Sequence, residues 1–231
     1  MKNSDSALRY VHKPSLFSSH QKLLRLVASN ESDLKVCLDI GCATGYFSSE
    51  LRDLGWSVIG IEPDLYASKL ALENCEKVIN SRIEDVNFSQ LPPYNCVILG
   101  DVLEHLAQPD QILRSIVDNL ETEGTIYLSI PNIANVSVRL LLMMGKFNYT
   151  NRGILDHTHL RFFTFKSALQ LVRDSSLIVE KVQVTPIPIE IAFTLLSRGY
   201  FRWLLFILDR VTRIFPKLLG YQIIIQAKKK S

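Results

Sequence analysis

The sequence has no long apolar run, no large excess of charge of one sign and no signal-like start. Its net charge of +3 over 231 residues is too small to predict a nucleic-acid partner. No stretch without a charged residue is longer than residues 124–138, which contain Ser, Pro and two Asn. A membrane span of about 18 apolar residues is therefore not expected. The start, MKNSDSALRYVHK, has no apolar segment, so we expect no secretory signal and a cytoplasmic location.

Cysteines are few and carry no metal-binding spacing. Cys37, Cys42, Cys75 and Cys96 include neither a CxxC pair nor a Cys/His cluster. Cys37 and Cys96 lie in segments that read as buried strands. We interpret the four as reduced thiols, mostly in the core of a cytoplasmic protein.

Short β-rich segments alternate with helical patterns from residue 35 to about residue 130. Strands that read as continuous apolar runs, separated by helices, are typical of a parallel sheet covered on both faces, and hence of a doubly wound α/β fold. The expected strands are 35–40, 57–61, 77–80, 96–100, 125–130, 177–185 and 221–227. The expected helices are 15–27 (with Ser15 as N-cap), 46–54, 65–74, 109–120 and 167–174.

We expect one domain over residues 1–231. Its parts are an N-terminal helical region (14–30), a cofactor-binding half (35–130), an irregular substrate loop (131–163) and a helical insertion (186–220). The insertion stands where a short hairpin would have sufficed to join the last two strands.

The most informative segment is LDIGCATGYF, residues 38–47. Gly41 and Gly45 bracket a tight turn between a strand that contains Asp39 and a helix. Glycines let the backbone approach a ligand, and the amides at a helix N-terminus attract oxygen atoms. Glu62 ends the next strand, where a carboxylate can accept both hydroxyls of a ribose. The spacing predicts an adenosine-containing ligand; the alternative is a strand–turn–helix corner whose glycines serve only packing.

The loop also indicates which adenosine ligand it binds. A dinucleotide loop reads G-x-G-x-x-G, whereas Ala43 stands at the middle position here, without a third glycine where a pyrophosphate-binding turn needs one. Asp39 would repel a pyrophosphate but attract the ammonium and sulfonium groups of S-adenosylmethionine. We therefore predict S-adenosylmethionine as the cofactor.

Five segments carry a resemblance to a known family. LDIGCATGYF, GIEPD, SRIEDV, VILGDVLEHL and GTIYLSIPN resemble the successive motifs of class I S-adenosylmethionine-dependent methyltransferases. The likeness covers about residues 20–185 and the last strand. It is strongest to small bacterial members that resemble ubiquinone-biosynthesis O-methyltransferases and cell-surface glycan methyltransferases. The resemblance implies a Rossmann-like, mostly parallel sheet of seven strands whose last strand, 221–227, is antiparallel.

The resemblance also implies a set of cofactor-binding residues. The glycine loop and its aspartate would hold the methionine end of the cofactor, and the glutamate would hold the ribose. Pro63 and Ile83 would flank the adenine, and the two residues after the fourth strand would line the cleft. Where the family often has an Asp for the adenine, this chain has Arg82, so backbone groups near Ile83 or the side chain of Asp85 would replace it. The set is Asp39, Gly41, Gly45, Glu62, Pro63, Ile83, Glu84, Asp101 and Val102.

Three histidines are candidates for a general base, which assists methyl transfer to a hydroxyl group. His105 follows the fourth strand beside Glu104, where the alternative role is to orient the loop. His157, His159 and Arg161 alternate along one segment, so we expect them to face the cleft together, with Arg161 binding substrate. The alternative is a well-bonded loop. A metal site would need a further ligand such as Asp156, and none is predicted.

The mean hydropathy of +0.13 is high for a soluble enzyme, and the excess lies in the insertion. Residues 186–231 also hold eight basic and two acidic residues. On a helical wheel Arg198, Arg202, Asp209 and Arg213 form a narrow polar stripe, and Gly199 offers a break between two helices. The insertion is interpreted either as a lid or dimer surface or as an interfacial helix among anionic headgroups. We expect some of its apolar face to pack against the protein.

The sequence thus predicts an S-adenosylmethionine-dependent methyltransferase that acts on oxygen of a small-molecule, glycan or lipid-linked acceptor. It would work in the cytoplasm, free or on the membrane face through residues 189–215; the sequence leaves its oligomeric state open. A non-catalytic module with the same fold is the alternative. A nicotinamide-dependent oxidoreductase is disfavoured by the glycine spacing.

Overall fold

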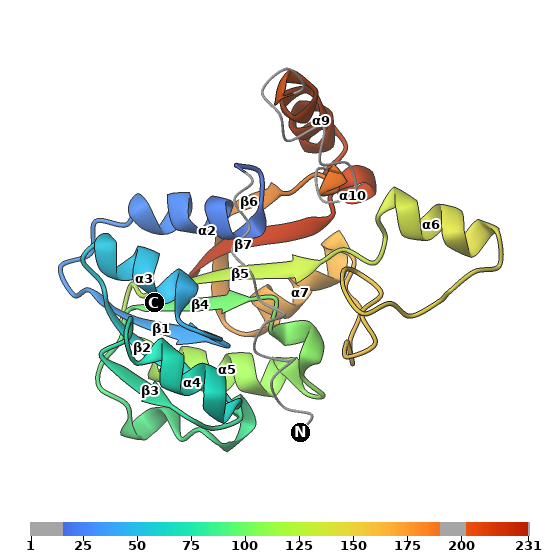
Figure 1. The fold of residues 1–231 in the computed structure, drawn as a ribbon. Helices are drawn as coiled ribbons and strands as arrows, with labels where there is room; N and C mark the ends of the chain where they lie inside the picture. Colours follow the sequence, from blue (N-terminus) through green and yellow to red (C-terminus); the bar gives the residue numbers. More distant parts are fainter. Residues whose placement is uncertain (1–15, 190–201, 231) are drawn as a thin grey trace.

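A computed structural model of the chain describes residues 16–189 and 202–230. Its centre is a seven-stranded sheet in the order β3-β2-β1-β4-β5-β7-β6, with helices on both faces (Figure 1). The strands are β1 (Val36–Ile40), β2 (Ser57–Ile61), β3 (Lys77–Ile79), β4 (Cys96–Gly100), β5 (Thr125–Pro131), β6 (Leu177–Val184) and β7 (Gln222–Lys229).

Most of the helices lie near their predicted positions, but the helix over residues 136–143 was not predicted. The helices are α2 (Ser19–Ala28), α3 (Tyr46–Asp53), α4 (Leu65–Ala71), α5 (Pro109–Asn119), α6 (Val136–Met143), α7 (Phe165–Asp174), α9 (Arg202–Ile214) and α10 (Pro216–Leu219). Three short 3-10 helices are η1 (Ile83–Asp85), η2 (Phe88–Gln90) and η3 (Leu103–His105).

The sheet confirms the predicted fold class. Strands β3, β2, β1, β4 and β5 pair in parallel, and β7 runs antiparallel to both β5 and β6. The chain leaves β1 toward β2 and β3 and then returns to place β4 on the other side of β1. At such a switch point the connections diverge, so the carboxyl ends of β1 and β4 border a crevice.

Alternating side chains of the strands feed two buried clusters. Leu38 of β1 joins the cluster on the face of α5 and α7, while Cys37 joins the cluster on the face of α2 and α3. Cys37 lies opposite Cys96 in the register of β1 and β4. All four cysteines are buried free thiols, as the sequence predicted.

Helix α2 begins later than predicted. Its N-cap is Ser18, whose side chain accepts a hydrogen bond from the amide of Gln21, whereas the predicted start was residue 15. Residues 14 and 15 lie outside the described residues. The buried side of α2 includes Lys22, whose Nζ donates to the carbonyl of Val184 at 2.6 Å and to Oδ1 of Asp209 at 2.7 Å.

Two segments interrupt the regular alternation of strands and helices, residues 131–163 and the insertion before β7, and both contain helices. Residues 131–163, expected to be irregular, contain α6 between residues 136 and 143. Helix α9 follows residue 201; Arg198 and Gly199 lie outside the described residues. Part of the apolar face of α9 packs against the protein, as expected, because Leu205 is buried. Trp203 and Phe206 are more than half exposed. None of the described helices has the length and apolar character to cross a membrane.

Candidate active site

The glycine loop between β1 and α3 has the backbone that its glycines allow. Gly41 and Gly45 adopt φ values of +72° and +76°, which only glycine adopts without strain. A Cβ on Gly45 would lie 2.8 Å from the backbone of Ala71, so the loop needs glycine there for packing as well. Gly41 is exposed. Because Gly45 is also the N-cap of α3, no side chain caps the first amides of that helix.

Two buried carboxylates adjoin this loop. Asp39 accepts a hydrogen bond from Oγ of Ser48 at 2.6 Å. Glu62 accepts one from the amide of Ala43 and one from the amide of Asp64, both at 2.9 Å. Burial raises the pKa of Asp39 to about 6; the Ser48 hydroxyl opposes this, and the Glu62 charge adds to it. Burial likewise raises the pKa of Glu62, although the hydrogen bonds from the amides of Asp64 and Ala43 lower it.

The donor set fits the predicted cofactor better than a dinucleotide. Asp39 and Glu62 are both buried carboxylates with raised pKa values, so the cationic end of S-adenosylmethionine would stabilise their charge, whereas a pyrophosphate would be repelled. Each carboxylate oxygen of Glu62 accepts one hydrogen bond from a backbone amide and keeps a lone pair that can accept a second one from a ribose hydroxyl.

The residues predicted near the adenine lie at the carboxyl ends of β2 and β3. Pro63 is exposed, Ile83 is buried at the start of η1, and Glu84 pairs with Arg82 at 3.3 Å. Asn80, which the sequence analysis missed, donates to the carbonyls of Glu62 and Pro63 at 2.9 and 3.1 Å. The sequence pattern that could have indicated Asn80 is a polar residue directly after the end of a strand. The roles of these residues toward adenine remain predictions.

Asp101 and Val102 connect the cofactor loop with the next group of side chains. A Cβ on Gly41 would lie 3.1 Å from Cγ2 of Val102. Asp101 adopts a φ of +58°, and its carboxylate accepts from Oγ of Ser129 at 2.6 Å and from Nε2 of Gln222 at 2.7 Å. Sequence reasoning missed these two partners because they stand on β5 and β7, remote in the chain.

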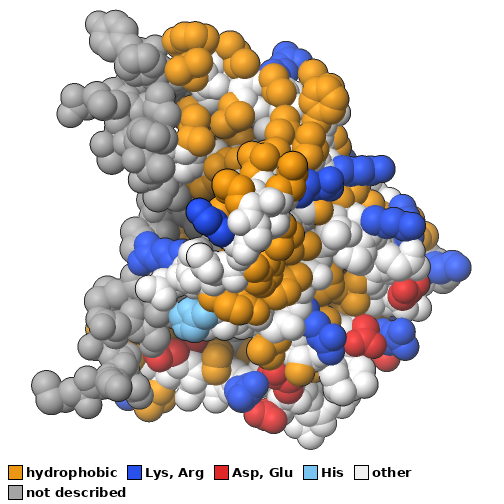
Figure 2. Space-filling model, turned by 90° about the vertical axis from the view of Figure 1, so that its right-hand side faces the viewer, with side chains coloured by type: hydrophobic (Ala, Val, Ile, Leu, Met, Phe, Trp, Pro, Cys, Tyr) orange, Lys and Arg blue, Asp and Glu red, His pale blue; other side chains and the backbone are white. Residues whose placement is uncertain are grey.

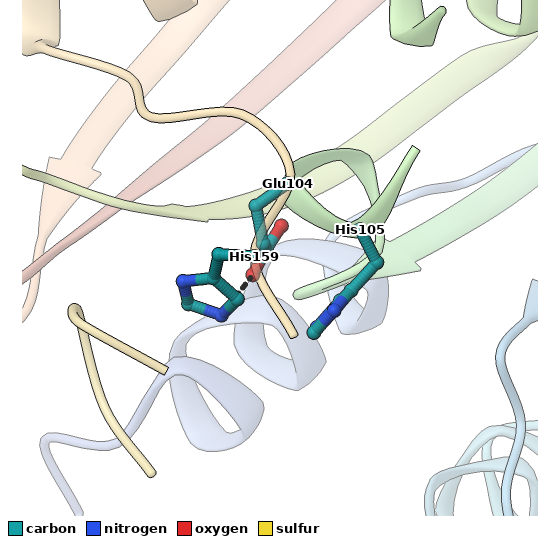
Figure 3. A group of neighbouring side chains, drawn as sticks. All are labelled: Glu104, His105 and His159. Atoms are coloured by element: carbon teal, nitrogen blue, oxygen red, sulfur yellow. Dashed lines mark ion pairs between the residues drawn. The ribbon is translucent and has the colours of Figure 1, made fainter. Parts of the chain in front are cut away.

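Glu104, His105 and His159 form a cluster beyond Val102 (Figure 3). The first two belong to η3, and His159 lies on the loop after α6. Nε2 of His159 lies 4.0 Å from Oε1 of the buried Glu104, and its ring centroid lies 4.8 Å from that of His105. Nδ1 of His159 lies 3.0 Å from the carbonyl oxygen of Ile154 and therefore donates to it. Burial and the neighbouring His105 lower the pKa of His159, so the ring is neutral near pH 7.

The loop that carries His159 is fastened to η3 by its backbone. The amides of Leu160 and Arg161 donate to the carbonyl of Glu104 at 2.8 and 3.0 Å. The guanidinium of Arg161 donates to the carbonyl of Ala107 at 2.6 Å from Nη2. Arg161, predicted to bind substrate, thus holds two loops together; a contact with substrate stays a prediction.

The expected trio of His157, His159 and Arg161 does not form one group among the described contacts. The side chain of His157 is 48% exposed and lies 3.5 Å from Asp156, and its Nδ1 lies 3.3 Å from the carbonyl oxygen of Thr150. A two-residue alternation predicts one common side only for an extended strand, and this segment is bent into turns.

The cluster also has donor atoms suited to a metal ion. Glu104, His105 and His159 each offer one ligand atom, and these atoms lie within 4.8 Å of one another. The carboxylate of Asp156, the further ligand that the sequence offers for a metal site, instead accepts hydrogen bonds from the amide and hydroxyl of Thr158. The structure gathers Glu104 there instead.

Comparison with known proteins assigns the family. A family model described as "Methyltransferase domain" matches residues 12–181. The mitochondrial ubiquinone biosynthesis O-methyltransferase of Schizosaccharomyces pombe is 27% identical over 160 residues, 64% of this chain and 57% of that protein. The ubiquinone biosynthesis O-methyltransferase of Aeromonas salmonicida is 31% identical over 157 residues, 62% of this chain and 65% of that protein. The chain spans about half the length of the curated relatives it matches.

Solved structures share the fold. An S-adenosylmethionine-dependent methyltransferase from Archaeoglobus fulgidus matches with a TM-score of 0.61 at 19% identity, over 92% of this chain and 95% of that one. The 1,6-didemethyltoxoflavin-N1-methyltransferase of Burkholderia thailandensis, solved with S-adenosylhomocysteine, matches with a TM-score of 0.58 at 14% identity, over 93% and 80%. These identities support the fold alone.

Proposed function

The chain belongs to the family of methyltransferase domains, and on that premise we propose that it transfers the methyl group of S-adenosylmethionine to an oxygen atom of its acceptor. The observation that carries this proposal is the row of groups along one sheet edge. The glycine loop with Asp39 and Glu62 comes first, Val102 packs beside it, and the pair of Glu104 and His159 follows.

The chain's own groups hold the cofactor by charge and by hydrogen bonds. The ionised carboxylate of Asp39 would attract the cationic end, and the oxygens of Glu62 would accept the ribose hydroxyls. The exposed backbone of Gly41 allows close approach. When bound, S-adenosylmethionine supplies an electrophilic methyl group on a sulfonium. Alignment of the acceptor with that methyl group is the main contribution of such a site.

His159 is the proposed general base. Its Nδ1–H is committed to the Ile154 carbonyl, which leaves Nε2 as the proton acceptor. A proton taken up at Nε2 creates an imidazolium 4.0 Å from the carboxylate of Glu104, which stabilises it. The lowered pKa keeps the ring unprotonated near neutral pH. His105 packs edge-on against His159 and orients it.

A divalent cation between Glu104, His105 and His159 is a second arrangement for the same reaction. Their three ligand atoms, within 4.8 Å, favour it. In that arrangement the three side chains would hold the ion, whose charge would lower the pKa of the acceptor hydroxyl. Removal of metal ions separates the two mechanisms.

The acceptor is proposed to be a small molecule, glycan or lipid-linked intermediate with an apolar part. The O-methyltransferases that the chain resembles are named for ubiquinone biosynthesis. Exposed apolar side chains on α6 and α9, in the segments after β5 and before β7, support an apolar acceptor.

The test is methyl transfer from labelled S-adenosylmethionine to fractionated lipid and glycan extracts. Label in a product that forms with the wild-type protein and not with the Asp39→Asn variant supports the proposal. Cofactor binding without transfer to any fraction would instead support the non-catalytic alternative.

A further inference from the structure

Helix α9 is turned with its apolar face outward. Trp203, Phe206, Ile207 and Ile214 are 57%, 51%, 51% and 68% exposed, whereas Asp209 and Thr212 are 4% and 0% exposed. A helix on a protein surface normally buries apolar side chains and exposes polar ones. Leu205 is buried and Phe206 contacts Phe17 edge-on, so α9 packs part of its apolar surface against the chain and leaves the rest exposed beside polar side chains that are buried.

A buried ion pair fixes this orientation. Nζ of Lys22, on α2, lies 2.7 Å from Oδ1 of Asp209, and both side chains are at most 5% exposed. Nη2 of Arg213 lies 2.6 Å from Oδ2 of the same carboxylate. Because a buried carboxylate is costly without its partner, rotation of α9 to hide its apolar face would break a strong contact.

Helix α6 exposes a second apolar group with the same kind of charge around it. Leu140, Leu142, Met143 and Met144 are 53%, 50%, 83% and 59% exposed. From residue 124 to residue 155 the only charged residues are Arg139, Lys146 and Arg152, all exposed. Around α9 and α10, the exposed charged residues from 203 to 221 are Arg210, Arg213 and Lys217.

Two buried asparagines join these segments. Nδ2 of Asn132 and Nδ2 of Asn135, the N-cap of α6, each lie 2.9 Å from the carbonyl oxygen of Gly220, just after α10. Nδ2 of Asn135 also donates to the carbonyl of Leu219 at 3.0 Å. Both asparagines are completely buried. The N-terminal end of α6 and the C-terminal end of α10 are therefore held in a fixed relation.

Figure 2 views the side of the molecule toward which β5 points. Hydrophobic side chains cover much of the upper and central part of this face, with Lys and Arg among them. Asp and Glu are confined to its lower half. The apolar area thus lies at the sheet edge that carries the site, with basic side chains among it.

We propose that the exposed apolar and basic side chains of α6, α9 and α10 form one docking surface for an anionic lipid bilayer. Apolar side chains enter the boundary between headgroups and acyl chains, while Arg and Lys pair with lipid phosphates. The surface deepens the proposed function, on which it rests for the acceptor, because it brings the site to a lipid-linked substrate. A second copy of the chain fits the surface poorly, since two such faces would oppose basic side chains.

Trp203 gives a direct readout, because the chain has two tryptophans and Trp56 is only 3% exposed. The full-length protein is mixed with vesicles of phosphatidylcholine alone or with equal parts of phosphatidylglycerol, with and without brominated acyl chains. We expect co-sedimentation with the anionic vesicles, weakened by salt, and quenching of the exposed tryptophan by bromine. Absence of binding to anionic vesicles, or binding without quenching, would overturn the proposal.

Two substitutions separate the surface from general apolar adhesion. Trp203→Glu should weaken partition onto anionic vesicles about tenfold, because one large apolar side chain no longer enters the lipid. Leu65→Glu, on α4, alters a side chain that is 59% exposed away from α6 and α9, and should leave partition unchanged. Equal effects of both would contradict the proposal. So would a dimer in light scattering that Trp203→Glu dissociates while vesicle binding is absent.

Failure here is distinguishable from failure of the proposed function. Cofactor titration and methyl transfer to a water-soluble acceptor test the site without vesicles. Trp203→Glu should leave cofactor affinity unchanged, because Trp203 lies on the insertion and not among the residues proposed to hold the cofactor.

Discussion

Nε2 of His159 lies 4.0 Å from Oε1 of the buried Glu104, although 55 positions separate the two residues in the chain. Backbone hydrogen bonds from Leu160 and Arg161 to the Glu104 carbonyl hold the two segments together. This arrangement places a neutral imidazole next to a carboxylate that can stabilise its protonated form.

Replacing His159 should remove the base. We expect His159→Gln to lower kcat about 10²–10⁴-fold, with a smaller effect on KM. The wild-type rate should fall at low pH along a limb below the ordinary histidine pKa, since burial lowers the pKa of His159, and the variant should lack this limb. His157→Gln, at an exposed histidine, is the control. Equal losses in the two variants would contradict the assignment.

Removal of metal ions distinguishes the base from a bound cation. If His159 acts as the base, dialysis against a chelator should leave the rate of methyl transfer unchanged. Loss of activity that added Zn²⁺ or Mn²⁺ restores would instead assign the cluster of Glu104, His105 and His159 to a metal ion.

Cofactor affinity should depend on pH through the buried carboxylates. The ionised form of Asp39 attracts the cationic end of the cofactor, and its pKa is about 6. Affinity should therefore fall as the pH drops through about 6, and Glu62, whose pKa is also raised, contributes to the same fall. Titrations across this range in two buffers measure the protons released. Asp39→Asn should bind more weakly near neutrality and show a shallower pH dependence; an unchanged profile would contradict the assignment.

The buried pair of Lys22 and Asp209 should matter for stability. Lys22→Met leaves the Asp209 carboxylate buried with Arg213 alone, and we expect a loss of about 3 kcal/mol in the free energy of unfolding. Adding Asp209→Leu should recover much of that loss, because no buried charge remains. Urea denaturation measures both, with Lys69→Met at an exposed position of α4 as control. A double variant no more stable than Lys22→Met would refute the explanation.

Gly45 should be less replaceable than Gly145, although both have positive φ. A Cβ on Gly45 meets the backbone of Ala71 at 2.8 Å, while a Cβ on Gly145 has no atom within 4 Å. Gly145→Ala thus reports the cost of the backbone conformation, about 1 kcal/mol. Gly45→Ala should cost clearly more by urea denaturation. Similar losses in the free energy of unfolding for the two variants would show that close packing against Ala71 does not require glycine at position 45.

The sequence predicted the sheet well because its strands carry local signals. Ser57–Ile61 and Cys96–Gly100 are continuous apolar runs, and the structure has strands at those positions. The glycine loop was also predictable, since positive φ values at Gly41 and Gly45 need that residue type. Local pattern and tertiary structure agree at these places.

Contacts between distant segments were not predictable. The pairing of Lys22 with Asp209 joins residues far apart in the chain, and it places a charged side chain on the buried side of α9. Gln222 reaches Asp101 only because β7 returns beside β5. His157 and His159 contact different backbone carbonyls, those of Thr150 and Ile154, because the segment bends into turns that its alternating pattern does not reveal.

Isothermal titration with S-adenosylmethionine tests the central claim most directly. We predict saturable binding at one site per chain. Glu62→Gln should weaken it about tenfold or more, because charged hydrogen bonds to the ribose become neutral ones. Glu73→Gln, at an exposed position, should leave the affinity unchanged. No binding by the wild-type protein, or equal affinity in wild type and Glu62→Gln, would contradict the account.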